Sequence, residues 1–300
     1  MKKKIAIIGA NSYIARNVAF ALNQSPELYE IILYDYKDIQ IDGMENYKRI
    51  NILSADSLKT IDFDCDVFFM FVGKTGSANG FDDFDTFIDI NERALLYLLH
   101  EYRKQSSKAK IIFPSTRLIY KGKTGPQKED AEKEFKTIYA INKFACEQYL
   151  EIYNRVYGVQ YCIFRICIPY GTLISNASSY GTAEFMLSKA KKGENITLYG
   201  DGRLRRTFTY MGDLCNILIA GAMSDKCVNN VFNVGGEDYS LFEIATLVAE
   251  KYGVGIDFSL WPEVALKIES GNTVFDSEKL DSLIGRIYGM RFKDWIARCK

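Results

Sequence analysis

Two side chains at helical spacing have the types needed for proton chemistry. Tyr139 and Lys143 bracket the segment Tyr-Ala-Ile-Asn-Lys, and residues four apart lie on one face of a helix. An ammonium group lowers the pKa of a neighbouring phenol, so that Tyr139 can act as a general base. The same lysine can also bind the ribose of a cofactor. In a chain with 20 tyrosines such a pair arises easily by chance. Whether the pair is functional must therefore be judged from its position relative to the expected strands.

A hydroxyl at the end of a strand provides that position. Thr116 closely follows the apolar run Lys110–Pro114, which reads as a strand, and the helix carrying Tyr139 and Lys143 comes next. In open α/β sheets, side chains at the carboxyl ends of parallel strands point into the crevice where ligands bind. We therefore take Thr116, Tyr139 and Lys143 as the candidate catalytic residues, with Ser115 beside them.

A turn near the N-terminus is suited to a dinucleotide. The expected strand Lys4–Ile8 runs into Gly9 and then a helix, with Ser12 and Ala15 at the other two positions of a G-x-x-G-x-x-G spacing. Small residues there let backbone N–H groups and the helix N-terminus approach a pyrophosphate. An ordinary strand-to-helix turn is the alternative. The cofactor-binding candidates in this turn are Gly9, Asn11, Ser12, Tyr13 and Ile14.

An acidic residue favours one dinucleotide over the other. Asp35 ends the second expected strand, near the spacing at which a carboxylate binds the adenine-ribose hydroxyls. A carboxylate there repels a 2′-phosphate, so NAD is expected rather than NADP. A solvated aspartate at a strand end is the alternative.

Strand-like and helix-like segments alternate over the first two-thirds of the chain. This alternation predicts an α/β fold with a doubly wound parallel (Rossmann) sheet. We expect a cofactor domain over residues 1–174, to which 203–236 returns, and a smaller C-terminal substrate-binding lobe over 175–300. The expected strands are Lys4–Ile8, Ile31–Tyr34, Tyr47–Asn51, Val67–Val72, Lys110–Pro114, Tyr161–Ile168 and Val231–Val234, and the expected helices Tyr13–Gln24, Asp85–Arg103, Tyr139–Tyr157 and Gly181–Lys192.

Composition removes several classes of function. Lys+Arg and Asp+Glu both number 38 in 300 residues, so no net charge attracts nucleic acid or an anionic membrane. His100 is the single histidine, which excludes a histidine-based zinc site and a Ser-His-Asp triad; no metal is expected. The seven cysteines are scattered, as reduced thiols are. No apolar stretch approaches the roughly 18 residues of a membrane span, and a cytoplasmic protein is expected.

Several segments, in order, resemble those of one family. Pro114–Tyr120 is similar to the Ser-Ser/Thr-x-x-x-Tyr segment of the extended short-chain dehydrogenases, the NAD-dependent sugar epimerase/dehydratase group, in which the hydroxyl four before the tyrosine is catalytic. That position is Thr116. The resemblance covers nearly the whole chain, because four more segments share it: Ile90–Glu92, Arg165–Gly171, Ile196–Asp213 and Phe232–Gly236.

The resemblance implies roles for individual residues. Tyr139 would take the proton of a sugar hydroxyl while C4 gives hydride to NAD, Thr116 would hold that oxygen, and Lys143 would orient the nicotinamide ribose. Arg206 would pair with a diphosphate, a solvated arginine being the alternative. The family also implies a homodimer through the helices Asp85–Arg103 and Tyr139–Tyr157 and a role in polysaccharide biosynthesis. Further implied contacts are Phe71, Val72, Gly73, Asn91, Ser115 and Ile168 for the cofactor, and Lys74, Ser115, Thr116, Tyr199 and Arg206 for the substrate.

The type of reaction follows from what the segments contain and lack. Dehydratases of the group carry Asp-Glu directly after the catalytic threonine, whereas Arg117 and Leu118 occupy these positions. Reductases of the group usually use NADPH, which Asp35 disfavours. We therefore expect a 4-epimerase acting on a UDP-sugar. An NAD(P)-dependent nucleotide-sugar dehydrogenase or reductase is an alternative, and a catalytically silent dinucleotide-binding regulator or scaffold is another.

Two departures from the family pattern concern the substrate. Ile168 replaces an asparagine that bonds the substrate. Glu269-Ser-Gly-Asn272 stands where the family has Arg-x-Gly-Asp, so an acid replaces an arginine expected near the nucleotide phosphates or ribose. Either the nucleotide binds differently, or it is not UDP.

Overall fold

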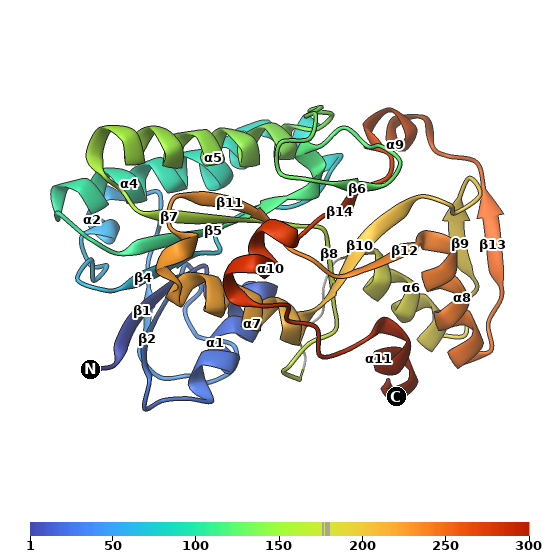
Figure 1. Ribbon diagram of the computed structural model, residues 1–300, viewed down its shortest axis with the longest axis horizontal. Helices are drawn as coiled ribbons and strands as arrows, with labels where there is room; N and C mark the ends of the chain where they lie inside the picture. Colours follow the sequence, from blue (N-terminus) through green and yellow to red (C-terminus); the bar gives the residue numbers. More distant parts are fainter. Residues whose placement is uncertain (176, 178–180, 300) are drawn as a thin grey trace.

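A seven-stranded parallel sheet forms the centre of the molecule. The computed structural model describes residues 1–175, 177 and 181–299, and Figure 1 shows the sheet with helices on both faces. Its strand order is β11-β7-β5-β4-β1-β2-β3, and every neighbouring pair is parallel. The doubly wound α/β fold is confirmed. The strands are β1 (Lys3–Ile8), β2 (Tyr29–Asp35), β3 (Tyr47–Arg49), β4 (Val67–Met70), β5 (Lys110–Thr116), β7 (Tyr161–Ile166) and β11 (Asn230–Asn233).

Both faces of this sheet are buried, as the mostly apolar sequences of its central strands predict. Every residue of β1 from Ile5 onward, of β4 and of β7 is buried. Helices α1 (Tyr13–Asn23) and α7 (Met211–Met223) cover one face, and α4 (Ala94–Lys104) and α5 (Ile138–Tyr157) cover the other (Figure 1). The short helix α2 (Ala55–Leu58) packs beside α4. No helix in the described part of the chain is long and apolar enough to cross a membrane.

A smaller lobe lies at one end of the sheet (Figure 1). Its strands form a sheet of order β12-β10-β8 and a parallel pair, β9 with β13. Segment 211–233 packs α7 and β11 onto the large sheet; the division of the chain at residue 174 stays a prediction. The remaining elements are β8 (Ile168–Tyr170), β9 (Ile196–Tyr199), β10 (Arg205–Tyr210), β12 (Glu237–Ser240), β13 (Ile256–Ser259), α6 (Thr182–Lys191), α8 (Leu241–Tyr252), α9 (Glu263–Ile268), α10 (Glu278–Ile284), α11 (Phe292–Arg298) and the pair β6 (Pro126–Gln127) with β14 (Val274–Phe275).

Two elements that were expected to be continuous are divided in the structure. The strand expected over Tyr161–Ile168 is two strands, because β7 ends at Ile166 and β8 pairs with β10 in the smaller sheet. Pro169 suits the edge position of β8, since it has no N–H to donate to a second neighbour. The helix expected over Asp85–Arg103 is interrupted: α3 (Phe84–Ile88) and α4 flank a π-helical turn at Asp89–Arg93.

Candidate active site

A cavity of about 900 Å³ opens where β1, β2 and β4 end, at the carboxyl edge of the sheet. Eight of the predicted site residues line it: Gly9, Asn11, Ser12, Asp35, Phe71, Val72, Gly73 and Lys74. The remaining lining residues were not predicted from the sequence, although all of them except Ser57 of α2, Ile8 and Ile90 lie at or just after the ends of β2 and β3, where the same strand-end argument applies. These residues are Tyr36, Lys37, Arg49, Ile50, Asn51, Ile52, Ser57, Ile8 and Ile90.

Gly9 allows the first turn to approach the end of β4. Its φ is +84°, and a Cβ built there would lie 2.8 Å from the carbonyl carbon of Phe71 and from the nitrogen of Val72. Neither is a flexible side chain that could move aside. The N–H groups of Gly9 and Ala10 both donate to the carbonyl of Tyr34. The backbone of three strands is therefore packed together at the floor of the cavity.

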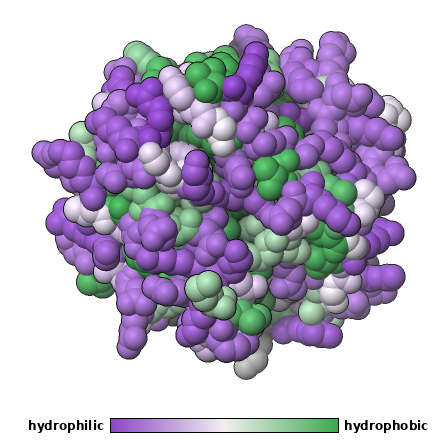
Figure 2. Space-filling model, turned by 60° about the vertical axis from the view of Figure 1, so that its left-hand side comes forward, coloured by the Kyte–Doolittle hydropathy of each residue, from purple (hydrophilic) through white to green (hydrophobic). Residues whose placement is uncertain are grey.

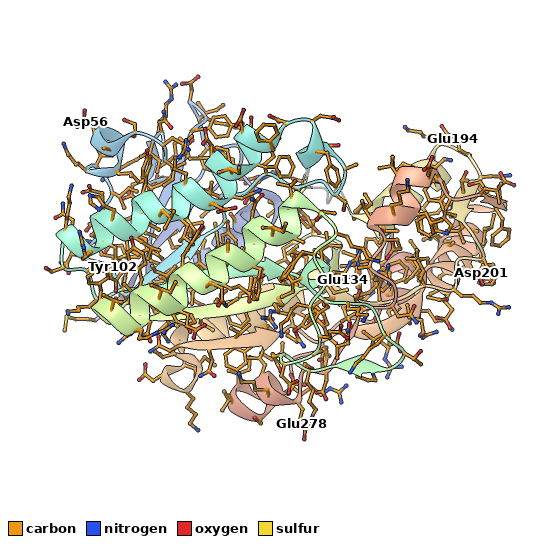
Figure 3. The ribbon with its side chains drawn as sticks, turned by 90° about the horizontal axis from the view of Figure 1, so that it is seen from above. Asp56, Tyr102, Glu134, Glu194, Asp201 and Glu278 are labelled. Atoms are coloured by element: carbon orange, nitrogen blue, oxygen red, sulfur yellow. The ribbon has the colours of Figure 1, made fainter. Side chains whose placement is uncertain are left out.

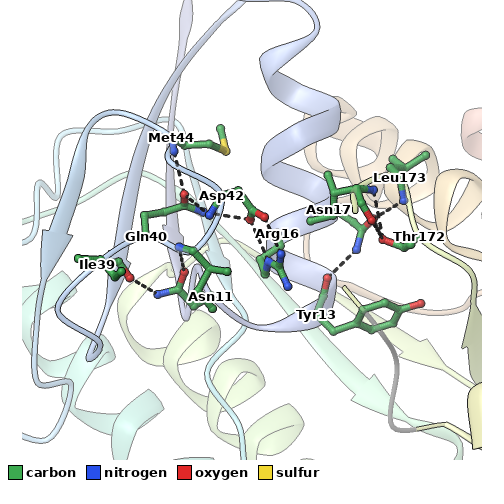
Figure 4. A network of polar contacts seen from close by, with 12 residues as sticks. Asn11, Tyr13, Arg16, Asn17, Ile39, Gln40, Asp42, Met44, Thr172 and Leu173 are labelled. Atoms are coloured by element: carbon green, nitrogen blue, oxygen red, sulfur yellow. Dashed lines mark hydrogen bonds and ion pairs between the residues drawn. The ribbon is translucent and has the colours of Figure 1, made fainter. Parts of the chain in front are cut away.

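The side chain of Asn11 fixes the loop after β2 (Figure 4). Its Nδ2 donates to the carbonyl of Ile39 at 3.0 Å, and its Oδ1 accepts from the N–H of Ile41 at 2.9 Å. Its own backbone N–H donates to Oδ2 of Asp35 at 2.9 Å. Arg16 adds an ion pair with Asp42 farther along the same loop. These contacts hold one wall of the cavity with the Asp35 carboxylate in it.

Tyr13 and Ile14, which were predicted to contact the cofactor, do not line the cavity. The Tyr13 hydroxyl donates to the carbonyl of Gly171, so this side chain links helix α1 to the chain after β8. Ile14 packs against the core between the sheet and α1.

Gly73 is the point where the cavity meets the catalytic candidates. A Cβ built at Gly73 would lie 3.3 Å from Oδ1 of Asn91 and 3.6 Å from Nζ of Lys143. Asn91 bonds both backbone groups of Lys74, accepting from its N–H at 2.8 Å and donating to its carbonyl at 3.0 Å. It lies in the π-helical turn, a feature frequent at functional sites. Asn91 therefore holds the chain after β4 close to Lys143.

Lys143 and Tyr139 approach each other from one face of α5, as predicted. Nζ of Lys143 lies 6.0 Å from the centre of the Tyr139 ring and donates to the carbonyl of Pro114 at 2.9 Å. Burial lowers the pKa of Lys143 to about 8, against the raising effects of Cys146 and Glu147. Burial raises the pKa of Tyr139 to about 12, and a hydrogen bond with the Thr116 hydroxyl opposes this shift. The structure thus brings Thr116, Tyr139 and Lys143 together.

Ser115 presents an unpaired polar atom beside this group. Its Oγ is buried and has no hydrogen-bond partner among the described residues. A buried hydroxyl without a partner costs free energy. A ligand at this position would supply the missing partner.

Of the predicted substrate contacts, Lys74 lines the cavity, whereas Ile168, Tyr199 and Arg206 lie on strands β8, β9 and β10 of the smaller lobe. Lys74 forms an ion pair with Asp83. Ile168 is buried in β8, and Tyr199 is exposed, with its ring 5.3 Å from that of Trp261. Contacts of Lys74, Ile168 and Tyr199 with a substrate therefore stay predictions.

Arg206 is not a solvated arginine, because it is only 1% exposed. Nη2 lies 2.5 Å from Oε1 of Glu269, while Nη1 donates to the carbonyls of Arg205 and Gly271. The acid that departs from the family pattern is therefore its counter-ion. Whether Arg206 also pairs with a diphosphate stays a prediction.

Comparison with known proteins gives one family. Residues 5–235 match the sequence model of the NAD dependent epimerase/dehydratase family. A decarboxylase of UDP-N-acetyl-α-D-glucosaminuronate from Bacillus cytotoxicus is 28% identical, over 82% of this chain and 79% of its own. A provisionally named UDP-glucose 4-epimerase from Methanocaldococcus jannaschii is 27% identical over 55% of this chain, which spans about half (54%) of that relative.

Solved structures agree on the fold. The Tyr149→Phe variant (its own numbering) of UDP-glucuronic acid 4-epimerase from Bacillus cereus superimposes with a TM-score of 0.87, covering 98% of this chain and 96% of its own. At 22% identity, this likeness shows the fold alone.

Proposed function

Because the chain belongs to the NAD-dependent epimerase/dehydratase family, we propose that it is an epimerase acting at C4 of a nucleotide-activated sugar. NAD is its cofactor. The observation that carries the proposal is the assembly of Thr116, Tyr139 and Lys143, with Lys143 next to Gly73 in the lining of the cavity. A proton acceptor next to a dinucleotide site is what oxidation of a carbinol requires.

The residues of the cavity fit this cofactor. Gly9 and Ser12 line the cavity at the start of α1, where N–H groups favour anions such as a pyrophosphate. The buried Asp35 carboxylate faces the cavity from the end of β2, where it can accept from ribose hydroxyls. When bound, NAD would supply the acceptor for the hydride of the sugar carbon and, once reduced, the donor that returns it.

The chain's own residues handle the proton. Tyr139 takes it from the C4 hydroxyl, and Thr116 bonds the same oxygen. With a pKa of about 12, Tyr139 keeps its proton at neutral pH in the unliganded protein, so its deprotonation is tied to ligand binding. Lys143, with a pKa of about 8, is mostly charged at pH 7 and stabilises the phenolate.

Arg117 and Leu118 support an epimerase over a dehydratase. They follow Thr116 and carry no carboxyl group that could serve as the acid or base for loss of water. An intact Thr116, Tyr139 and Lys143 group argues against a silent scaffold. A nucleotide-sugar dehydrogenase or reductase is a further alternative, and it differs from an epimerase in changing the amount of free NADH.

The test begins with the purified protein, without added cofactor. We expect denaturation to release close to one NAD or NADH per chain, and the intact protein to interconvert the C4 epimers of a UDP-, dTDP- or GDP-sugar without net NADH. Tyr139→Phe should lower the rate by about 10²- to 10⁴-fold while retaining the dinucleotide. Accumulating NADH would indicate a dehydrogenase, and released CO₂ a decarboxylase. A dinucleotide that stays bound without turnover of any of these sugars would leave the silent scaffold.

We also propose that the protein is a cytoplasmic homodimer that serves polysaccharide biosynthesis. The proposed interface is the outer surface of α4 and α5, which lie side by side (Figure 3). On the face of the molecule that Figure 2 shows, apolar side chains lie in small clusters between hydrophilic ones. Light scattering of the purified protein tests the dimer, with a charged substitution at Ile152 as the disrupting variant. The exposed apolar residues of the two helices are Tyr97, Ile141, Ile152, Val156 and Tyr157.

A further inference from the structure

Arg117 carries a positive charge without a counter-ion. It follows Thr116 directly and is half-buried. Its Nη1 donates to Oγ of Ser270 at 2.9 Å and to Oγ1 of Thr273 at 3.4 Å, and both of these partners are neutral. Among the described residues Arg117 has no ion pair, and its Nε and Nη2 have no hydrogen bond. Most of the five N–H donors of the guanidinium group are therefore available.

A second guanidinium adds to this excess of positive charge. Burial, and next the charge of Arg117, lower the pKa of Arg206 to about 10. Glu269 is the acid paired with Arg206. Lys136 does not change the balance, because it pairs with Glu134 and donates only to the backbone carbonyl of Glu269. The carboxylate of Glu269 thus pairs with Arg206 alone, and an anion from outside the chain would supply the counter-charge that Arg117 lacks.

The position of Arg117 relative to the reacting atom indicates which anion. Its Cα lies about 3.8 Å along the chain from that of Thr116, which in the proposed function bonds the oxygen at C4. In a hexose ring C6 is attached to C5, next to C4, whereas the nucleotide diphosphate is attached at C1 across the ring. A group held beside Thr116 is therefore nearer to C6 than to the diphosphate.

We propose that Arg117 binds a C6 carboxylate, so that the substrate is a nucleotide-activated uronic acid. The planar fork of a guanidinium matches a carboxylate with two parallel hydrogen bonds. Arg206, on β10 of the smaller lobe, remains for the diphosphate end. This inference rests on the proposed function, because that function places C4 at Thr116.

A purely structural role for Arg117 predicts a different outcome. The segment around Ser270 packs closely on the loop after β5: a Cβ at Gly122 would lie 2.0 Å from the carbonyl oxygen of Ser270. If Arg117 only tied this segment down, its loss would weaken acidic and neutral sugars alike. The proposal requires a loss confined to the acidic sugar.

The test compares kcat/KM for UDP-glucuronate and UDP-glucose in the NAD-loaded protein. We expect the wild type to prefer UDP-glucuronate, and Arg117→Gln to lose roughly 10- to 100-fold on that substrate alone, as a charged hydrogen bond predicts. The kcat/KM of Arg117→Lys for UDP-glucuronate should lie between those of the wild type and Arg117→Gln, because an ammonium group cannot form two parallel hydrogen bonds with a carboxylate. The control is Arg203→Gln, which removes the same charge from a side chain that is 86% exposed. A wild-type preference for UDP-glucose, or equal losses on both sugars, would overturn the inference.

Binding measurements separate this inference from the proposed reaction. Titration of the wild type and Arg117→Gln with UDP-glucuronate, UDP-glucose and UDP should show a weakened affinity for UDP-glucuronate only. A parallel loss for UDP would assign Arg117 to the diphosphate and overturn the carboxylate. If neither sugar is epimerised but UDP-glucuronate still binds through Arg117, the proposed reaction fails and the carboxylate site stands.

Discussion

The backbone N–H of Asn11 donates to the carboxylate of Asp35 at 2.9 Å. Asp35, which is expected to select NAD over NADP, therefore also holds the turn after β1, which is expected to bind the pyrophosphate of the cofactor. A second hydrogen bond, from the N–H of Lys37 to Oδ1 at 3.3 Å, fixes the carboxylate from the other side. These hydrogen bonds link the ends of β1 and β2 through the side chain of Asp35. A substitution that tests the charge of Asp35 must therefore keep an oxygen that accepts the hydrogen bond from Asn11.

Asp35→Asn meets this condition and tests the preference for NAD. Its amide oxygen can still accept from Asn11, while the charge that repels a 2′-phosphate is lost. We expect the ratio of the NADP and NAD dissociation constants to fall by about 10-fold or more, since removing one repulsive charge contact is worth about 1–2 kcal/mol. Calorimetric titration with both dinucleotides measures it. Asp38→Asn, whose side chain is 82% exposed, should leave the ratio unchanged; an unchanged ratio in Asp35→Asn would contradict the assigned role.

Gly9 and Gly43 form a matched pair for the packing of the first turn. Both have positive φ, +84° and +71°, but a Cβ at Gly9 meets the backbone of Phe71 and Val72 whereas one at Gly43 meets nothing within 4 Å. Gly43→Ala should cost about 1 kcal/mol in unfolding free energy, from the left-handed backbone alone. Gly9→Ala should cost about 3 kcal/mol or more, because the backbone must also shift, and should weaken NAD binding. Urea unfolding measures both costs, and equal costs would show that the close approach has no energetic weight.

The sheet and the grouping of Thr116, Tyr139 and Lys143 could be predicted because their signals are local. Apolar runs such as Val67–Met70 mark buried strands, and the spacing of Tyr139 and Lys143 places both on one helical face. The change of sheet after Ile166 could not be read in this way, since the apolar character continues into Ile168.

Contacts between distant residues were also beyond the sequence. Glu269 was recognised as a departure from the family pattern, but its pairing with Arg206, 63 residues away in the chain, is a tertiary contact. The cavity residues Asn51 and Ile52 follow a three-residue strand that was expected to be longer. Its true end, at Arg49, is what places them at the edge of the sheet.

Burial of Lys143 predicts a stability that rises with pH. Its pKa is about 8 in the folded chain against 10.5 as the ordinary value, so between these pH values the unfolded state binds more protons and unfolding becomes less favourable. Relative to Lys143→Met, the wild type without NAD should gain about 3 kcal/mol in unfolding free energy from pH 8 to pH 10.5. Urea unfolding of both proteins across this range measures the difference. Parallel profiles would mean that the folded-state pKa of Lys143 is not lowered.

Glu269→Gln tests whether the carboxylate and a diphosphate compete for Arg206. The amide oxygen can still accept from the N–H of Gly271, which the carboxylate does at 3.0 Å, but the buried guanidinium loses its counter-charge. We expect the unliganded variant to lose about 2–3 kcal/mol of unfolding free energy, since breaking a buried ion pair leaves an uncompensated charge. UDP would then supply that charge, so its affinity should rise and its stabilising effect on Tm should exceed that in the wild type. Glu134→Gln, which alters an ion pair with Lys136 at 3.2 Å, is the control. Weaker UDP binding in Glu269→Gln would instead place the diphosphate away from Arg206.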